Sequence, residues 1–195
     1  HMKIYLLRHE IRPLADSTLL TELFDIGKER AAGSLKELLL KEPIDEIYAS
    51  PFLRVLQTVN PYSEASNIKI KGEFAITEFV NEPMFEKKPN LVLSDDLKGQ
   101  FNLDKTYQSM WNPLLVRHPE PMQNLVERTE LFARYLENTY KHTDKSILIV
   151  SHMDPIQVLL SYFTKQEYGR TYLYKMGRVV KIDTCITEVL CEGYE

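Results

Sequence analysis

Four consecutive aliphatic residues, Ile147 to Val150, constrain the fold of this 195-residue chain more than any other feature of its sequence. A run of this kind without polar alternation is typical of a strand that is covered on both faces, as in a parallel sheet between helices. Residues 3–7 form a second apolar run, and 44–49 and the alternating segment 68–71 have the pattern of two more strands. Segments with a 3.6-residue apolar period separate them. This alternation predicts an α/β fold with a mostly parallel sheet.

The helices expected between these strands begin at recognisable signals. Ser50 before Pro51 has the form of an N-cap with proline at the first helical position, and Asp154 before Pro155 is similar. Pro61 is expected to kink or shorten the first of these helices. Because parallel crossovers are right-handed, helices should cover both faces of the sheet and give a single-domain three-layer sandwich. The expected helices are 27–42, 51–65, 121–140 and 154–163, and the last two strands are 179–182 and 186–190.

The composition is that of an ordinary globular domain, with 44% hydrophobic and 27% charged residues. His1 and Met2 resemble the remnant of an expression tag, so the domain is expected to span 3–195. No signal peptide and no membrane-spanning apolar stretch is present. Cys185 and Cys191 lack a CxxC spacing, which favours reduced, buried thiols in a cytoplasmic protein.

The overall charge argues against nucleic-acid and membrane partners. A net charge of −4 provides no global field that would attract a nucleic acid or an anionic membrane. An anionic ligand would therefore need a local basic cluster. Residues 80–118 contain three prolines and weak helical signals. They are expected to form an excursion over one end of the sheet, where the active site would lie.

Cationic and hydrogen-bonding residues follow three of the expected strands. Arg8-His9 follows the first strand, Ser50 and Arg54 follow the second, and Ser151-His152 follows the 147–150 strand. In open α/β sheets ligands bind beyond the carboxyl ends of the strands, so these groups should meet at one edge. Helix N-termini there add partial positive charge. Two arginines with two histidines predict a site for a doubly charged anion, and phosphate fits best.

No known cofactor motif accompanies this cluster. The chain has no GxxxxGK[ST], no GxGxxG and no HExxH, and His9 and His152 lack the carboxylate or thiolate companions of a zinc site. We therefore expect no metal and no cofactor. A histidine can then be the nucleophile and form a phosphohistidine intermediate.

The motifs around these residues resemble those of the histidine phosphatase superfamily, also called phosphoglycerate mutase-like. Leu6-Leu7-Arg8-His9 resembles the RHG signature, and residues 45–58, DEIYASPFLRVLQT, are close to the family's xxIYSSPLxRxxQT block. Leu20-Thr21 with Gly27 and Ala31 resembles a stretched LTxxGxxQA segment, and Val150-Ser151-His152 resembles VSHG. The matches keep the family's order and cover 3–58 and 120–163.

The resemblance implies a role for each matching residue. His9 would be phosphorylated, and Arg8, Arg54 and His152 would bind the phosphate. Glu78, in an LxE-like context, would protonate the leaving oxygen and later deprotonate water, with Glu82 as the fallback. The protein-tyrosine-phosphatase-like members read RHGER, and Arg12 matches the last arginine of that motif as a further phosphate ligand. This match leans toward an aryl phosphate or phosphotyrosine, while sugar phosphates and nucleotides stay open.

Two residues depart from the family pattern. Glu10 and Met153 occupy positions where glycine is usual. A carboxylate beside phosphate would be repulsive unless it pairs with Arg12 or points away, and we expect it to point away. His118 and His142 carry no companion motif and are expected at the surface. Tyr107, Met110 and Trp111 are expected either to line the pocket or to pack in the core.

The expected chemistry sets requirements on two pKa values. The nucleophile must be neutral imidazole, and we expect Arg8, Arg12 and Arg54 to lower the pKa of His9. A hydrogen bond from one ring nitrogen to backbone would aim the other at phosphorus. Glu78 needs a raised pKa or a substrate that brings its own proton.

The sequence favours a metal-independent phosphomonoesterase that acts on a phosphorylated small molecule or a phosphoprotein. A phosphoglycerate mutase-type isomerase would use the same residues, but those enzymes are usually longer. A phosphate-binding pseudoenzyme is the third alternative, and Glu10 alone supports it.

Overall fold

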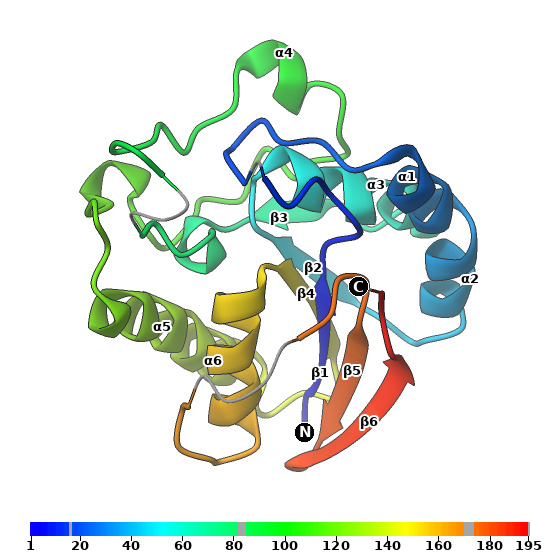
Figure 1. Ribbon diagram of the computed structural model, residues 1–195. Coiled ribbons are helices and arrows are strands. Elements are labelled where there is room, and N and C mark those ends of the chain that lie inside the picture. Colours follow the sequence, from blue (N-terminus) through cyan, green and yellow to red (C-terminus); the bar gives the residue numbers. More distant parts are fainter. Residues whose placement is uncertain (16, 82–84, 170–173, 195) are drawn as a thin grey trace.

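The computed structural model describes residues 1–15, 17–81, 85–169 and 174–194. Figure 1 shows one α/β unit, with a sheet at its centre and the N- and C-termini at its periphery. The strands are β1 (Lys3–Arg8), β2 (Glu46–Ala49), β3 (Ile70–Gly72), β4 (Ser146–Ser151), β5 (Val179–Asp183) and β6 (Ile186–Cys191). The helices are α1 (Asp25–Ala32), α2 (Ser34–Leu40), α3 (Leu53–Ser66), α4 (Asp95–Lys98), α5 (Met122–Tyr140) and α6 (Met153–Phe163), with 3₁₀ turns η1 (Phe74–Ile76) and η2 (Pro113–Leu115).

The six strands form one mixed sheet in the order β3-β2-β4-β1-β5-β6. The pairs β3–β2, β2–β4 and β4–β1 are parallel, whereas β5 and β6 add an antiparallel hairpin at one edge. The expected mostly parallel sheet is thus confirmed. The four apolar residues of β4 lie at the centre of the sheet and are fully buried.

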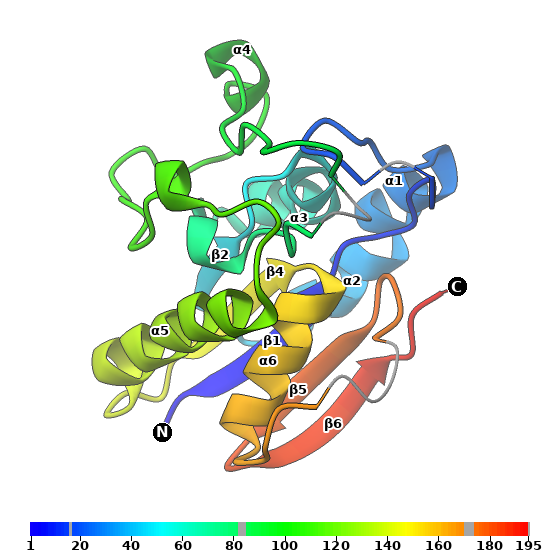
Figure 2. The same cartoon turned by 60° about the vertical axis from the view of Figure 1, so that its left-hand side comes forward.

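Helices cover both faces of this sheet, as the alternating pattern predicts. Helices α1, α2 and α3 pack on one face and α5 and α6 on the other, and the two views agree on this division (Figures 1 and 2). Each face has its own apolar cluster. Leu56 and Leu39 belong to the first cluster, and Phe132 and Leu159 belong to the second.

Several helix boundaries differ from the prediction. The expected helix 27–42 is two helices, because Gly33 adopts φ −116° and ψ −103° and interrupts the ladder. Helix α3 passes through Pro61 and continues to Ser66, so the proline does not shorten it. The predicted N-cap at Ser50 is wrong, since α3 begins at Leu53 after Phe52.

The second N-cap prediction is also wrong. Helix α6 begins at Met153, and His152 is its N-cap residue without a capping side-chain bond. Asp154 lies inside the first turn and is buried. The error at Ser50 has a physical cause, because its Oγ lies 2.8 Å from His152 Nε2. The Ser50 hydroxyl therefore contacts the second motif histidine instead of capping a helix.

The described parts of the excursion, residues 80–81 and 85–118, are mostly irregular apart from α4 and η2. Tyr107, Met110 and Trp111 pack against the α5–α6 cluster, which decides between the two alternatives in favour of packing. The buried Glu73 carboxylate anchors this region. It accepts hydrogen bonds from Tyr107 Oη at 2.6 Å and from the Met110 amide at 3.0 Å.

The cysteine prediction is half right. Both thiols are free, but Cys185 is exposed and Cys191 is half-buried because they belong to the β5–β6 edge hairpin. Within the described ranges, no helix is both long enough and apolar enough to cross a lipid bilayer.

Candidate active site

The two motif histidines meet at the carboxyl ends of the central strands. Strands β1 and β4 are neighbours in register, with Arg8 opposite Ser151. His9 and His152 therefore follow directly at one edge, and the His9 amide donates to the Ser151 carbonyl at 3.1 Å. Their ring centroids lie 5.5 Å apart. Both histidines thus lie just beyond the carboxyl ends of parallel strands, where ligands bind in open α/β sheets.

The His9 ring is oriented by backbone and has one open nitrogen. His9 is fully buried, and its Nδ1 lies 2.8 Å from the Glu10 carbonyl oxygen. This contact places the proton on Nδ1 and leaves a lone pair on Nε2. Among the described residues, Nε2 has no hydrogen-bond partner. The expected hydrogen bond from one ring nitrogen to backbone is therefore present.

Arg54, Glu78 and His152 form a buried cluster next to this ring. Glu78 Oε2 lies 3.1 Å from Arg54 Nη2 and 3.3 Å from His152 Nδ1. The other Glu78 oxygen accepts a bond from the Phe79 amide at 3.0 Å. Helix α3 carries Arg54, and the turn after η1 carries Glu78. The structure thus brings together residues that stand 24 and 74 positions apart.

Two carbonyls hold the Arg54 guanidinium in place. Nη1 donates to the Thr18 carbonyl at 2.6 Å and Nη2 to the Ser17 carbonyl at 3.3 Å. Arg8 is held similarly, with Nη1 donating to the Tyr174 carbonyl at 2.7 Å. In both arginines the Nε atom is buried without a hydrogen-bond partner among the described residues. Arg12 Nη1 donates to the Pro13 carbonyl at 2.7 Å. Burial lowers the pKa of Arg8 and of Arg54 to about 10, and the Arg12 charge acts in the same direction.

The electrostatics of the cluster favour a neutral nucleophile. Burial lowers the pKa of His9 well below 6.5, and Arg54 and Arg8 act in the same direction. The expected direction is present, but burial is its main cause and Arg12 is not among the causes. Burial likewise lowers the pKa of His152 to about 4. Both rings are therefore uncharged at neutral pH.

Glu78 is ionised in this state. Burial alone would raise the pKa of Glu78, but His152, Arg54 and His9 together lower it well below 4.5. A raised pKa is therefore not what the structure shows. A proton for the leaving oxygen then has two sources. The substrate can deliver it, or a bound dianion can raise the pKa of Glu78 by adding negative charge beside it.

Glu10 points away from Arg8 and Arg54, toward the C-terminal segment. Its buried carboxyl faces Gly177 and Tyr194 (a β-carbon at Gly177 would lie 2.8 Å from Glu10 Oε1). Gly177 has φ +72° and its amide donates to the Arg8 and His9 carbonyls, so glycine is required there. Burial raises the pKa of Glu10 to about 7, while Arg30 acts in the opposite direction.

This carboxyl makes the stability of the protein depend on pH. Between pH 4.5 and about 7 the unfolded state loses the Glu10 proton while the folded state keeps it, so folding weakens as pH rises. We expect Glu10→Gln to remove this loss, which is on the order of 3 kcal/mol. Urea unfolding at pH 5 and pH 8 measures it, with the exposed Glu29→Gln as control. An equal gain at both pH values would contradict the prediction.

The other sequence predictions have mixed outcomes. Met153 is the first residue of α6 and packs against the α5–α6 cluster. His142 is exposed as expected, but the prediction for His118 is wrong because it is half-buried and Nε2 lies 2.6 Å from the Phe85 carbonyl oxygen. Glu82, the fallback acid, lies outside the described residues.

Sequence reasoning missed a second buried ion pair behind Glu78. Arg128 Nε donates to Glu120 Oε2 at 2.8 Å, and neither side chain is more than 1% exposed. The available signal was an arginine beside Leu125 and Thr129 on the apolar face of the 121–140 helix. Among the described residues, no group of three or more histidine, cysteine or carboxylate side chains could hold a metal ion.

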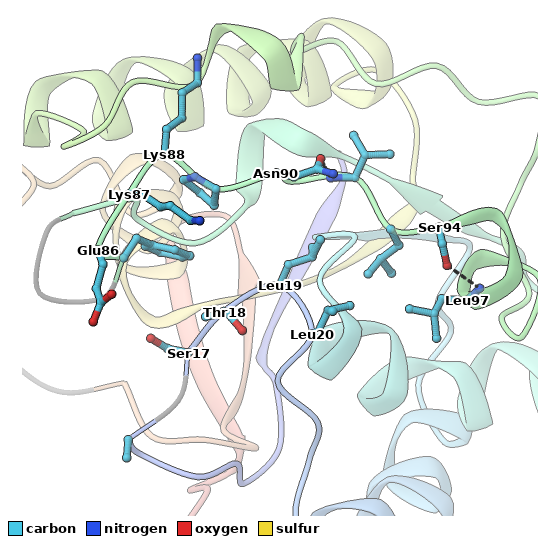
Figure 3. A pocket seen from close by; sticks show the side chains of 15 residues that line it. Ser17, Thr18, Leu19, Leu20, Glu86, Lys87, Lys88, Asn90, Ser94 and Leu97 are labelled. Carbon is cyan, nitrogen blue, oxygen red and sulfur yellow. Dashed lines mark hydrogen bonds between the residues drawn. The ribbon is translucent and has the colours of Figure 1, made fainter.

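A cavity of about 730 Å³ lies between the 15–20 segment and the 85–97 part of the excursion (Figure 3). Ser17 and Thr18, whose carbonyls hold Arg54, belong to its wall. Lys87 points across the cavity toward Leu19, whereas Lys88 points away from it (Figure 3). The apolar part of the lining consists of Ala15, Leu19, Leu20, Phe85, Pro89, Val92, Leu93 and Leu97.

Comparisons with known proteins agree with this fold. Residues 4–193 match the model of the histidine phosphatase superfamily (branch 1). The fold is similar to that of ecdysone phosphate phosphatase from Bombyx mori in complex with tungstate, at 16% identity and TM-score 0.74, over 97% of this chain and 92% of that one. It is also similar to α-ribazole phosphatase from Shigella flexneri, at 18% identity and TM-score 0.68, over 100% and 98%. A mycobacterial glucosyl-3-phosphoglycerate phosphatase with inorganic phosphate matches at 15% identity and TM-score 0.66, over 93% and 89%. No curated protein matches the sequence of the chain.

Proposed function

The chain belongs to the histidine phosphatase superfamily, branch 1, and on that premise we propose that it is a metal-independent phosphomonoesterase with a phosphohistidine intermediate on His9. The observation that carries the proposal is a set of three buried nitrogens without hydrogen-bond partners among the described residues. They are His9 Nε2, Arg8 Nε and Arg54 Nε, and they come from the carboxyl end of β1 and the first turn of α3. Buried polar groups are normally satisfied, so a set of this kind supports a ligand with several acceptor oxygens.

The first half-reaction transfers the phosphoryl group to His9. Nε2 forms a bond to phosphorus while the bond from phosphorus to the leaving oxygen breaks. Arg8, Arg54 and Arg12 neutralise the non-bridging oxygens, and His152 binds one of them by turning its Nδ1–H from Glu78 to the phosphate. The leaving oxygen takes a proton through Glu78, which receives it from the substrate monoanion or carries it because the bound dianion raises its pKa.

The second half-reaction restores the enzyme. Water attacks the phosphorus of phosphohistidine, and the Glu78 carboxylate accepts a proton from that water. The bond from phosphorus to Nε2 breaks, inorganic phosphate leaves, and His9 is again neutral. The position of Glu78 between Arg54 and His152 supports this dual use, because one carboxyl stays beside two proposed phosphate ligands in both steps.

The test is turnover together with detection of the intermediate. In the presence of EDTA we expect the protein to hydrolyse p-nitrophenyl phosphate and to carry an acid-labile, alkali-stable phosphoryl group on His9 after rapid quenching. Transfer between two positions of phosphoglycerate without net release of phosphate would instead identify a mutase. Phosphate binding without turnover from pH 5 to 8 would identify a pseudoenzyme.

The cavity supports a substrate class. We propose that the phosphomonoester is a small molecule with an apolar body and an anionic group at its far end. The Ser17 and Thr18 carbonyls contact the Arg54 guanidinium, and the same two residues line the cavity. The cavity therefore lies next to one of the proposed phosphate-binding arginines. Its apolar lining suits a ring system, and Lys87 is the cation that points inward (Figure 3). The similar structures are named for ecdysone phosphate, α-ribazole and glucosyl-3-phosphoglycerate, which are small molecules.

Aryl phosphates with similar phenol acidity test this class. We expect 2-naphthyl phosphate to have a KM about 10-fold below that of phenyl phosphate, because the second ring is buried. A carboxylate at C6 should lower KM about 3-fold more, and Lys87→Ala should abolish only that further effect. Lys105→Ala, an exposed lysine outside the cavity lining, is the control. Equal KM values for the phenyl and naphthyl esters would contradict the assignment.

A further inference from the structure

The buried pair Arg128–Glu120 contacts the backbone on both sides of Glu78. The Arg128 guanidinium binds the Glu120 carboxylate through two bonds, from Nε to Oε2 at 2.8 Å and from Nη2 to Oε1 at 3.0 Å. The same guanidinium donates from Nη1 to the Ala75 carbonyl at 2.7 Å and from Nη2 to the Glu78 carbonyl at 2.9 Å. One side chain thus ties α5 to the turn that carries the candidate acid.

Glu120 holds the backbone two residues after Glu78. Its Oε1 accepts a hydrogen bond from the Val80 amide at 3.1 Å. The Glu120 amide in turn donates to the Val80 carbonyl at 2.6 Å. Ser151 Oγ adds a bond to the Ile76 carbonyl at 2.6 Å, next to His152. These contacts fix five polar backbone atoms between residues 75 and 80: the carbonyl oxygens of 75, 76, 78 and 80 and the amide of 80. They therefore hold the backbone that carries the Glu78 side chain.

Stability alone is a weak reason for this arrangement. A buried ion pair often contributes no more to stability than well-packed apolar side chains of similar volume, because both charges lose their hydration. The donors and acceptors of this pair that are not used between Arg128 and Glu120 bind the backbone of residues 75–80. A displacement of about 1 Å at a reacting group can lower a rate about 100-fold, so fixing the backbone of an acid has a direct kinetic value.

We infer that Arg128 and Glu120 are positioning residues that hold the Glu78 carboxyl where it exchanges a proton with the leaving oxygen. The inference rests on the proposed function, in which Glu78 is the general acid. Within the described part of the chain, the hydrogen bonds of Arg128 and Glu120 reach neither His9 nor Arg54, so the nucleophile and the phosphate-binding arginines keep their own supports.

The dependence on the leaving group distinguishes positioning from a structural role. An acidic phenol such as p-nitrophenol leaves without much help, whereas phenol needs a proton. We expect Arg128→Lys to lower kcat/KM for phenyl phosphate about 30-fold and for p-nitrophenyl phosphate less than about 3-fold. Lysine keeps the charge but cannot span both the carboxylate and the two carbonyls. Arg134→Lys, an exposed arginine of α5 paired with Glu130, is the matched control.

Two reference variants keep the outcomes separable. Glu78→Gln should show the same selective loss, and Glu120→Gln replaces Arg128→Lys if the latter does not fold. An equal loss on both substrates, or no loss on either, would overturn the positioning role. A wild-type protein that forms no phosphohistidine would instead reject the proposed function, and a Glu78→Gln variant without selectivity would reject the acid assignment on which the inference rests.

Discussion

Replacing His9 with alanine should lower kcat/KM for p-nitrophenyl phosphate by roughly 10⁴-fold or more, the largest effect expected of any single change in this chain. The imidazole is the group that would bond to phosphorus, and no other described side chain presents an unpartnered ring nitrogen at this edge of the sheet. Its loss therefore removes the covalent route and leaves only electrostatic stabilisation of a direct attack by water.

Steady-state assays and quenched-flow labelling measure this effect together. The variant should neither turn over nor retain a phosphoryl group, while thermal unfolding should show a folded protein. His142→Ala is the matched control, because that histidine is exposed on the protein surface. Because burial holds the pKa of His9 well below 6.5, protonation of this ring should not lower the activity of the wild-type protein as the pH falls through 6.5. Residual activity above about a tenth of wild type in His9→Ala would place the nucleophile elsewhere.

The fold was predictable because its strongest signals are local. The apolar run of β4 and the periodic face of α5 depend on burial patterns that a strand or helix shows within its own residues. Once the strands are located, their carboxyl ends are known as well. Because His9 and His152 follow two of these ends, their proximity could also be predicted. The break at Gly33 was harder to predict, because one glycine inside an amphipathic pattern costs only about 1 kcal/mol.

The contacts that orient the site depend on partners far along the chain. Ser50 has the sequence signature of a helix cap, yet its hydroxyl contacts His152, which stands 102 residues away. A carboxylate at position 10 is expected to repel a phosphate, but Gly177 leaves room for the Glu10 carboxyl to point away. In the sequence, Arg128 is one charged residue among several on a long helix. In the structure it binds Glu120 and the Glu78 carbonyl. Local pattern does not encode such pairings.

Replacing Arg54 with lysine should lower kcat/KM about 1,000-fold even though the charge is kept. The guanidinium uses Nη1 and Nη2 on the Thr18 carbonyl, the Ser17 carbonyl and Glu78, and keeps Nε for the ligand. An ammonium group cannot fill these positions at once. Either the 17–18 segment or the phosphate would lose its donor, and Glu78 would lose one of the charges that lower its pKa.

Inhibition by inorganic phosphate separates these two losses. If Arg54 binds the phosphoryl oxygens, Arg54→Lys should raise the inhibition constant for phosphate about 10-fold or more, and kcat should fall further because the effect grows in the transition state. Arg117→Lys, an exposed arginine of the excursion, should change neither value. A variant that keeps its affinity for phosphate but loses kcat would assign Arg54 to orienting Glu78 and the 17–18 segment. Unchanged affinity and unchanged kcat would remove Arg54 from the site altogether, since the buried charge would then serve only the packing of α3.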